Sequence, residues 1–257
     1  MSVVEVIAVI VAALAAGAIN TIVGSGTLIT FPTLLALGVP PVTANISNSI
    51  GLVAGGISGT AGYLPELKGA GRLVARLLPA SLLGGITGAL LLLVLPPEAF
   101  EAIVPALIAL GVILVIVGPR LQAWARARHH DGGVTPTGQV IALIAGVFGA
   151  GIYGGYFGAA QGVILIGLLS ALSTEPLQRL NGLKNVLGTV VNAVASLIFI
   201  LVAPDLVDWG IVLLIAIGAV MGGLLGARIG RRMPANLLRA VIVLIGVVGI
   251  AKIVLDP

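Results

Sequence analysis

Seven apolar stretches, each about twenty residues long, constrain this chain more than any other feature of its sequence. A helix needs about 20 apolar residues to cross the hydrocarbon core of a bilayer. A transmembrane β-barrel would instead show segments of about 10 residues that alternate apolar and polar side chains, and these stretches do not alternate. The sequence therefore predicts an all-α polytopic membrane protein with stretches at residues 3–22, 72–95, 99–118, 138–159, 186–203, 209–227 and 236–255.

Composition supports the bilayer as the surroundings of this chain. Hydrophobic residues make up 59% and charged residues 9%, with a mean hydropathy of +1.22, which leaves too little polar surface to cover a soluble globule. The isoelectric point is near 10.0, but the net charge is only +4 and lies in short loops, so we predict no nucleic-acid partner. Cysteine is absent and no histidine or carboxylate cluster has ligand spacing, so we predict no metal and no cofactor.

The loop charges predict the topology. By the positive-inside rule the basic loops are cytoplasmic, while connections that carry only acidic residues lie outside. This places both termini outside the plasma (inner) membrane and residues 119–137 inside, so each half of the chain crosses an odd number of times. The basic residues are Lys68, Arg72, Arg76, Arg120, Arg126, Arg128, Arg228, Arg231, Arg232 and Arg239, and the acidic ones are Glu98, Glu101, Asp205 and Asp208.

An odd number of crossings means that the two halves have inverted topology. We expect residues 1–118 and 138–257 to form two inverted repeats, joined by a cytoplasmic linker at residues 119–137. Without gaps, residues 20–51 align with residues 156–187 at an offset of 136, which pairs two glycines, two prolines and two asparagines. Further along, the outer acidic loop of the first half corresponds to the basic loop around Pro234, as inversion requires.

Each repeat is expected to hold about five helices, one of them short. The short pieces, residues 25–38 and 161–173, reach only about 20 Å, so they either cross a thin region at a tilt or form one arm of a re-entrant hairpin. A polar helix follows each piece. Pro40 and Pro41 can start the first polar helix, and we expect a hydroxyl of Ser173 or Thr174 to cap the second ahead of Pro176.

The polar helices carry matching stripes at positions i, i+3 and i+4, which share one helix face. Amides and hydroxyls donate hydrogen bonds to oxyanions, and Lys184 adds a positive charge at membrane depth. Two other interpretations stay open: Lys184 extends to the nearby inner surface, or the amides and hydroxyls bond neighbouring helices. We expect an anion between the starts of the two polar helices, near Gly24, Ser25, Asn45, Asn48, Ser49, Gln161, Asn181, Lys184 and Asn185.

Two segments carry a family resemblance. From Gly24-Ser25-Gly26 through Pro40-Pro41 to Asn45, and again around Asn181, Lys184 and Asn185, the chain resembles the TauE/SafE sulfite exporter family, also called the toluenesulfonate uptake permease family. The resemblance covers nearly the whole chain. It implies a plasma-membrane transporter of small anions, often sulfur-containing, such as sulfite, sulfonates, sulfoacetate or thiosulfate, with other organic anions for some members.

Residues and resemblance together predict a secondary transporter that moves a small anion by alternating access, and not an enzyme. The alternatives are an anion channel, a carrier of non-sulfur organic anions and a purely structural membrane protein. An intramembrane hydrolase needs a base beside its nucleophile, but His129 and His130 lie in the predicted linker. No carboxylate lies deep in a predicted span, so the coupling ion stays open, with Glu66 and Glu175 as candidates; oligomeric state, including a homo-oligomer, also stays open.

Overall fold

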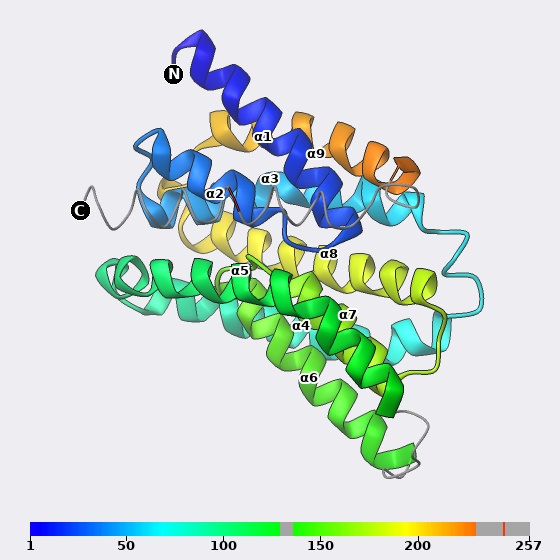
Figure 1. The fold of residues 1–257 in the computed structure, drawn as a ribbon. Coiled ribbons are helices and arrows are strands. Elements are labelled where there is room, and N and C mark those ends of the chain that lie inside the picture. The colour runs from blue at the N-terminus through cyan, green and yellow to red at the C-terminus, as the bar shows by residue number, and fades with distance from the viewer. Residues whose placement is uncertain (129–135, 230–243, 245–257) are drawn as a thin grey trace.

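The structure is a computed structural model that describes residues 1–128 and 136–229, together with Leu244 (Figure 1). Within these residues the chain is helical and contains no strand, which confirms the all-α prediction for the described part. The predicted span at 236–255, the charges at Arg231, Arg232 and Arg239, and His129 and His130 lie outside it. The elements in chain order are α1 (Val3–Ile22), α2 (Thr27–Ala36), α3 (Pro41–Gly62), α4 (Gly71–Val94), α5 (Pro97–Arg128), α6 (Pro136–Tyr156), α7 (Gln161–Leu172), α8 (Leu177–Val202), the 3₁₀ turn η2 (Pro204–Leu206) and α9 (Trp209–Ile229).

Six helices in the described residues are long and apolar enough to cross a membrane, namely α1, α4, α5, α6, α8 and α9. Each overlaps one of the six predicted stretches that fall within this part of the chain, although α8 begins nine residues before the predicted start at residue 186. Helix α3 is equally long, with 22 residues, but its asparagines, serines and glycines keep its hydropathy low. The chain is therefore a multi-pass α-helical protein suited to a bilayer.

Helices α2 and α7 are the two short pieces expected from the sequence. With 10 and 12 residues they extend about 15 and 18 Å, well below the thickness of a hydrocarbon core of about 30 Å. In Figure 1, α2 leads the chain back toward the edge of the bundle at which α1 begins. This course is that of a hairpin, with its turn inside the bundle.

The charged connections lie at opposite edges of the bundle. In Figure 1 the α3–α4 connection and the ends of α5 and α9, which carry the basic residues, lie at the right edge. The α4–α5 connection and η2, which carry the acidic residues, lie at the left edge, as does the N-terminus. The helix directions therefore agree with the alternation on which the predicted topology rests.

Small residues let two pairs of helices pack with their backbones in contact. In the pair α1–α9, a Cβ on Gly222 would stand 2.9 Å from the backbone nitrogen of Ala18. In the pair α4–α6, a Cβ on Gly88 would stand 2.7 Å from the backbone nitrogen of Tyr156. Such close approach is typical of membrane helices, where dispersion contacts between backbones stabilise the pair.

We expect Gly222→Ala to lower the thermal stability of the purified protein, because the added methyl group meets backbone atoms of α1 that cannot move aside independently. Overpacking of this kind costs about 1–3 kcal/mol. Gly149→Ala is the matched control, since Gly149 lies on the exposed face of α6 and an added methyl group there would meet nothing within 4 Å. Equal melting temperatures for the two variants would contradict the close packing of α1 against α9.

An aromatic cluster packs against the middle of α2. Phe31 of α2 meets Phe157, which follows α6, edge-to-face with ring centroids 5.0 Å apart, and meets Phe100 of α5 at 6.4 Å. All three side chains are buried. Edge-to-face contacts between buried rings add to the stabilisation from burial itself, so this cluster fixes the short helix against the long ones.

The polar helices begin at prolines, as predicted, but one capping prediction was wrong. Pro40 and Pro176 occupy the N-cap positions of α3 and α8 with nearly equal backbone angles, and neither helix start has a side-chain cap. The Ser173 hydroxyl instead accepts a hydrogen bond from the backbone N–H of Glu175, within the turn before the helix. Serine can bond its own local backbone in this way, which competes with helix capping.

The first part of the predicted linker is helical, because α5 continues to Arg128 and α6 starts at Pro136. The uninterrupted apolar run ends near Val117. The more polar turns that follow it stay helical, although their arginines no longer suit the hydrocarbon core. The helix is therefore longer than the apolar stretch that predicted it.

Candidate functional site

Two helix breaks inside the bundle prepare the candidate site. After α1, Gly24 adopts a φ of +88°, and its N–H donates to Ile19 O. After α6, Gly158 adopts a φ of +74°, and its N–H donates to Tyr153 O. A positive φ at the end of a helix favours glycine, which has no Cβ to clash with the backbone. The two breaks thus have the same geometry.

These equivalent breaks lie at an offset of 134, whereas the equivalent prolines lie at 136. Helix α7 has two residues more than α2, and this difference accounts for the change. The ungapped alignment of residues 20–51 is therefore interrupted within the short helix.

The two breaks touch at Gly24 and Gly162. The N–H of Gly162 donates to Gly24 O at 3.0 Å, and a Cβ on Gly162 would stand 2.9 Å from that same oxygen. Backbone contacts backbone here because neither residue has a side chain. The turn between α1 and α2 is therefore held directly against the start of α7.

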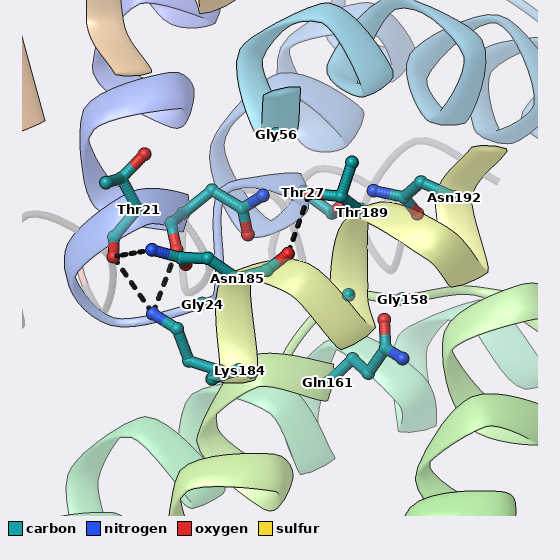
Figure 2. Close-up of a pocket in the computed structure, with 13 residues that line it drawn as sticks. Thr21, Gly24, Thr27, Gly56, Gly158, Gln161, Lys184, Asn185, Thr189 and Asn192 are labelled. Atoms are coloured by element: carbon teal, nitrogen blue, oxygen red, sulfur yellow. Dashed lines mark hydrogen bonds between the residues drawn. The ribbon is translucent and has the colours of Figure 1, made fainter. Parts of the chain in front are cut away.

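A buried cavity of about 30 Å³ lies beside this contact (Figure 2). One face of α8 forms much of its wall, since residues 184, 185, 188, 189 and 192 fall on neighbouring positions of successive turns. The α1–α2 and α6–α7 breaks and α3 supply the rest. The lining residues are Asn20, Thr21, Gly24, Thr27, Gly56, Gly158, Gln161, Gly162, Lys184, Asn185, Gly188, Thr189 and Asn192.

Lys184 is buried in this wall with 2% of its surface exposed. Its ammonium donates to Thr21 O at 3.0 Å and to Asn20 O at 3.2 Å, as Figure 2 shows. Both carbonyls belong to the last turn of α1, where helix carbonyls lack partners within the helix and the dipole is negative. The interpretation that Lys184 extends to the inner surface is therefore wrong.

The cavity is rich in hydrogen-bond donors and contains no acid. Among the described residues that line it, Lys184 is cationic, four carry amides, three carry hydroxyls, and none carries a carboxylate. A lysine ammonium has three donor hydrogens, and the two α1 carbonyls account for two of them. Such a set of groups can stabilise a negative charge, because ammonium, amide and hydroxyl groups can donate hydrogen bonds to it and no carboxylate repels it.

The structure brings four of the nine predicted site residues to the cavity, namely Gly24, Gln161, Lys184 and Asn185. The other five, Ser25, Asn45, Asn48, Ser49 and Asn181, lie outside its lining. The cavity also begins about two turns inside α8, whereas we expected the anion at the starts of the polar helices. The hydrogen bonds of Asn45 and Asn48 account for part of this difference.

Asn45 and Asn48 connect helices. The Asn45 amide nitrogen donates to Tyr156 O, at the end of α6, at 2.9 Å. The Asn48 side chain accepts a hydrogen bond from Thr30 and donates to the Thr27 hydroxyl at 3.3 Å, so it fastens α3 to α2. For these two asparagines the interpretation that amides bond neighbouring helices therefore applies. Thr27, which Asn48 binds, is itself part of the cavity wall.

Sequence reasoning missed several lining residues, above all Asn20, Thr21 and Thr27. Their signal was weak, because two lie at the end of a long apolar helix and one begins a short apolar helix. The polar residues on both sides of Gly24-Ser25-Gly26 could have indicated them, since a break inside a membrane must satisfy its backbone groups locally.

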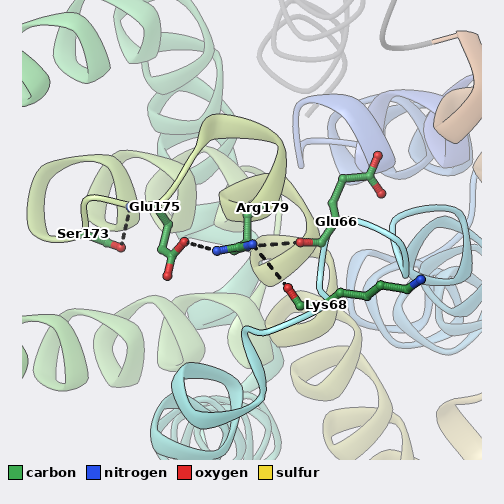
Figure 3. A network of polar contacts seen from close by, with 5 residues as sticks. All are labelled: Glu66, Lys68, Ser173, Glu175 and Arg179. Atoms are coloured by element: carbon green, nitrogen blue, oxygen red, sulfur yellow. Dashed lines mark hydrogen bonds and ion pairs between the residues drawn. The ribbon is translucent and has the colours of Figure 1, made fainter.

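The predicted candidates for coupling, Glu66 and Glu175, are not among the residues that line the cavity and lie in the connections before α4 and α8. Arg179 pairs with Glu175 and donates to Glu66 O and Lys68 O, each at 3.2 Å (Figure 3). About 30% of the Glu175 side chain is exposed. This network ties the α3–α4 connection to the start of α8.

The comparisons with known proteins identify the family. A family model described as sulfite exporter TauE/SafE matches residues 9–253. This chain belongs to the TauE/SafE family. It is therefore a multi-pass membrane protein of a transporter family, in agreement with its six apolar helices.

Curated relatives of this TauE/SafE chain carry matching names. It is 31% identical to a protein of Escherichia coli K12 named probable membrane transporter protein YfcA, over 95% of this chain and 87% of that one. It is 27% identical to the probable membrane transporter protein ORF9 of a Sinorhizobium species, over 96% and 91% of the two chains. A Haemophilus influenzae protein with a similar name is 26% identical over 93% and 90%. No solved structure matches.

Proposed function

We propose that this chain is a secondary transporter that carries a small, sulfur-containing oxyanion such as sulfite, a sulfonate, sulfoacetate or thiosulfate across the plasma membrane. The observation that carries the proposal is the buried, donor-rich cavity in which Lys184 has no carboxylate beside it. A positive charge inside a membrane protein is costly and usually serves a pathway or a ligand. The family's description as sulfite exporters supports the sulfur chemistry, and the names of the relatives support transport rather than catalysis.

Alternating access is the proposed mechanism, and the size of the cavity supports it. A volume of about 30 Å³ suits one water molecule, whereas an oxyanion has several heavy atoms. In the described conformation the cavity is therefore too small for the anion, and substrate binding requires the walls to separate. The contacts that close it are those of Lys184 with α1 and of Gly162 with Gly24.

An inverted repeat would supply the two alternative openings, and several contacts support this part of the proposal. If α1–α4 correspond to α6–α9, the tight pairs α1–α9 and α4–α6 are equivalent. The cross-contacts are equivalent as well: Asn45 of α3 binds the last carbonyl of α6, and Lys184 of α8 binds carbonyls in the last turn of α1. Each polar helix would then hold the first helix of the other half.

The proposed orientation follows the loop charges. The basic edge of the bundle, which includes Lys68, Arg72 and Arg76, faces the cytoplasm, and the N-terminus lies outside. The C-terminus is proposed to lie outside too, at the end of the second repeat.

A ligand screen tests the substrate. We expect sulfite, thiosulfate or sulfoacetate to raise the melting temperature of the purified protein, because binding to the folded state stabilises it. Carboxylates without sulfur should raise it less, and so should taurine, a sulfonate whose ammonium group leaves it without net charge. In liposomes, uptake of the stabilising anion should saturate and should be accelerated by the same anion on the opposite side. Stabilisation by neutral or cationic compounds alone would contradict the anion site, and uptake that never saturates would indicate a channel.

A further inference from the structure

Gln161 is a buried cavity residue with an unused donor. It is the first residue of α7, it lines the cavity, and 5% of its surface is exposed. Its amide nitrogen Nε2 is buried without a hydrogen-bond partner in the described part of the chain. Buried polar groups are almost always paired, because an unpaired one loses its hydration and gains nothing in exchange. The structure therefore leaves one strong donor unsatisfied within the cavity wall.

Gly154 on the neighbouring helix α6 makes room for this amide. A Cβ on Gly154 of α6 would collide with the amide group of Gln161. On the other side, a Cβ on Gly188 of α8 would stand 3.9 Å from its Oε1 atom. Figure 2 shows the amide oxygen on the side of Thr189 and Asn192 and the nitrogen turned away from them, and a half-turn about the terminal bond of the side chain exchanges the two. The space for the Gln161 side chain thus depends on the absence of a side chain at Gly154, whereas the contact at Gly188 would be an ordinary one.

Lys184 and Gln161 enter the cavity wall from different elements, the first from within α8 and the second from the start of α7. A sulfonate, sulfite or carboxylate spreads its charge over two or three oxygens, so different oxygens can bind the two donors where they stand. A halide ion is a single atom and can bind both donors only if they converge on one point.

We infer that Gln161 is a specificity-determining residue, whose amide N–H binds a second oxygen of the anion held by Lys184, so that the site selects oxyanions over halides. This inference rests on the proposed function and narrows its substrate class. The physical basis is that a site built to hydrogen-bond a polar group strongly rejects an analogue that lacks it, because its own donor is then left unpaired.

Titration of purified protein in detergent with sodium methanesulfonate and with sodium bromide tests the inference. We expect the wild type to bind methanesulfonate more tightly than bromide. Gln161→Met should weaken methanesulfonate binding about tenfold to a hundredfold, as for loss of a hydrogen bond to a charged group, and should leave bromide affinity within about threefold. Retained bromide binding also shows that the variant is folded.

Ser196→Ala is the matched control. Ser196 lies on α8, is 5% exposed like Gln161, and has a hydroxyl without a hydrogen-bond partner among the described residues, but it does not line the cavity. Its replacement should leave both affinities unchanged. If Gln161→Met loses affinity equally for both anions, or for neither, the proposed role of Gln161 is wrong. The anion site itself would still stand if binding depends on Lys184. If the wild type binds neither anion, both proposals fail.

Discussion

Replacing Lys184 by glutamine is expected to lower the affinity for the transported anion at least about thirtyfold. The ammonium is 2% exposed and faces no carboxylate in the cavity lining, so an anion there would be its charged partner. Removing one partner of a buried, hydrogen-bonded charge pair costs about 2–5 kcal/mol. Transport in liposomes should fall correspondingly, at substrate concentrations below saturation.

Glutamine is chosen because Lys184 has a second, structural role. Its Nζ atom holds Thr21 O and Asn20 O at the end of α1, and Asn185 donates to Thr21 O as well, at 3.3 Å. A glutamine amide is neutral but still offers N–H donors to these carbonyls. We therefore expect the free energy of unfolding to change by only about 1 kcal/mol. Lys184→Met, which removes donor and charge together, should lose both stability and binding.

The measurement combines the melting temperature with titration of the anion that stabilises the wild type most. Lys68→Gln is the matched control, since it makes the same chemical change at an exposed position in the α3–α4 connection. Wild-type affinity in Lys184→Gln would show that the charge serves only to hold α1. The anion site would then have to depend on the amides and hydroxyls alone.

The long helices could be predicted from the sequence because a helix that crosses a bilayer needs about 20 mostly apolar residues. The predicted stretch at 3–22 coincides with α1, and those at 72–95 and 209–227 differ from α4 and α9 by no more than two residues at either end. The prolines also marked the start of both polar helices, since a proline ring fits the first positions of a helix. Local chemistry fixed these features.

The cavity was only partly readable, because it depends on contacts between distant parts of the chain. The i, i+3, i+4 spacing placed Lys184 and Asn185 on one face of α8, where both line the cavity. It also predicted that Asn45 and Asn48 bind the anion, but they do not line the cavity. In the structure the asparagines of α3 are occupied by α2 and α6. The spacing of the asparagines does not reveal these hydrogen bonds, since Thr27 and Thr30 come close to Asn48 only when α2 folds back along α3.

The two polar helices contribute unequally to the cavity, and the residue pair Asn48 and Lys184 explains part of this difference. The two residues occupy matching positions at an offset of 136. The shorter amide reaches hydroxyls of its own half of the chain, on α2. The longer ammonium reaches backbone carbonyls of the other half of the chain, which contains α1. The difference between these two residues therefore gives one polar helix a packing contact and the other a charged group in the cavity wall.

Replacing Gly162 by alanine is expected to damage both stability and anion binding, because the contact at Gly24 closes the cavity. The new methyl carbon would stand 2.9 Å from Gly24 O and 3.1 Å from its carbonyl carbon, so the two backbones must separate and their hydrogen bond must lengthen. Overpacking costs about 1–3 kcal/mol, and the cavity wall moves with the start of α7.

Gly167→Ala is the control for this variant, because it lies in the same short helix with nothing within 4 Å of an added carbon. Its melting temperature and anion affinity should equal those of the wild type or rise slightly, since alanine restricts the unfolded chain more than glycine does. If Gly162→Ala behaves like Gly167→Ala in both measurements, α7 does not press on the α1–α2 turn. The backbone contact between the two breaks would then be wrong, and the hydrogen bonds of Lys184 and Asn185 from α8 would have to hold the end of α1.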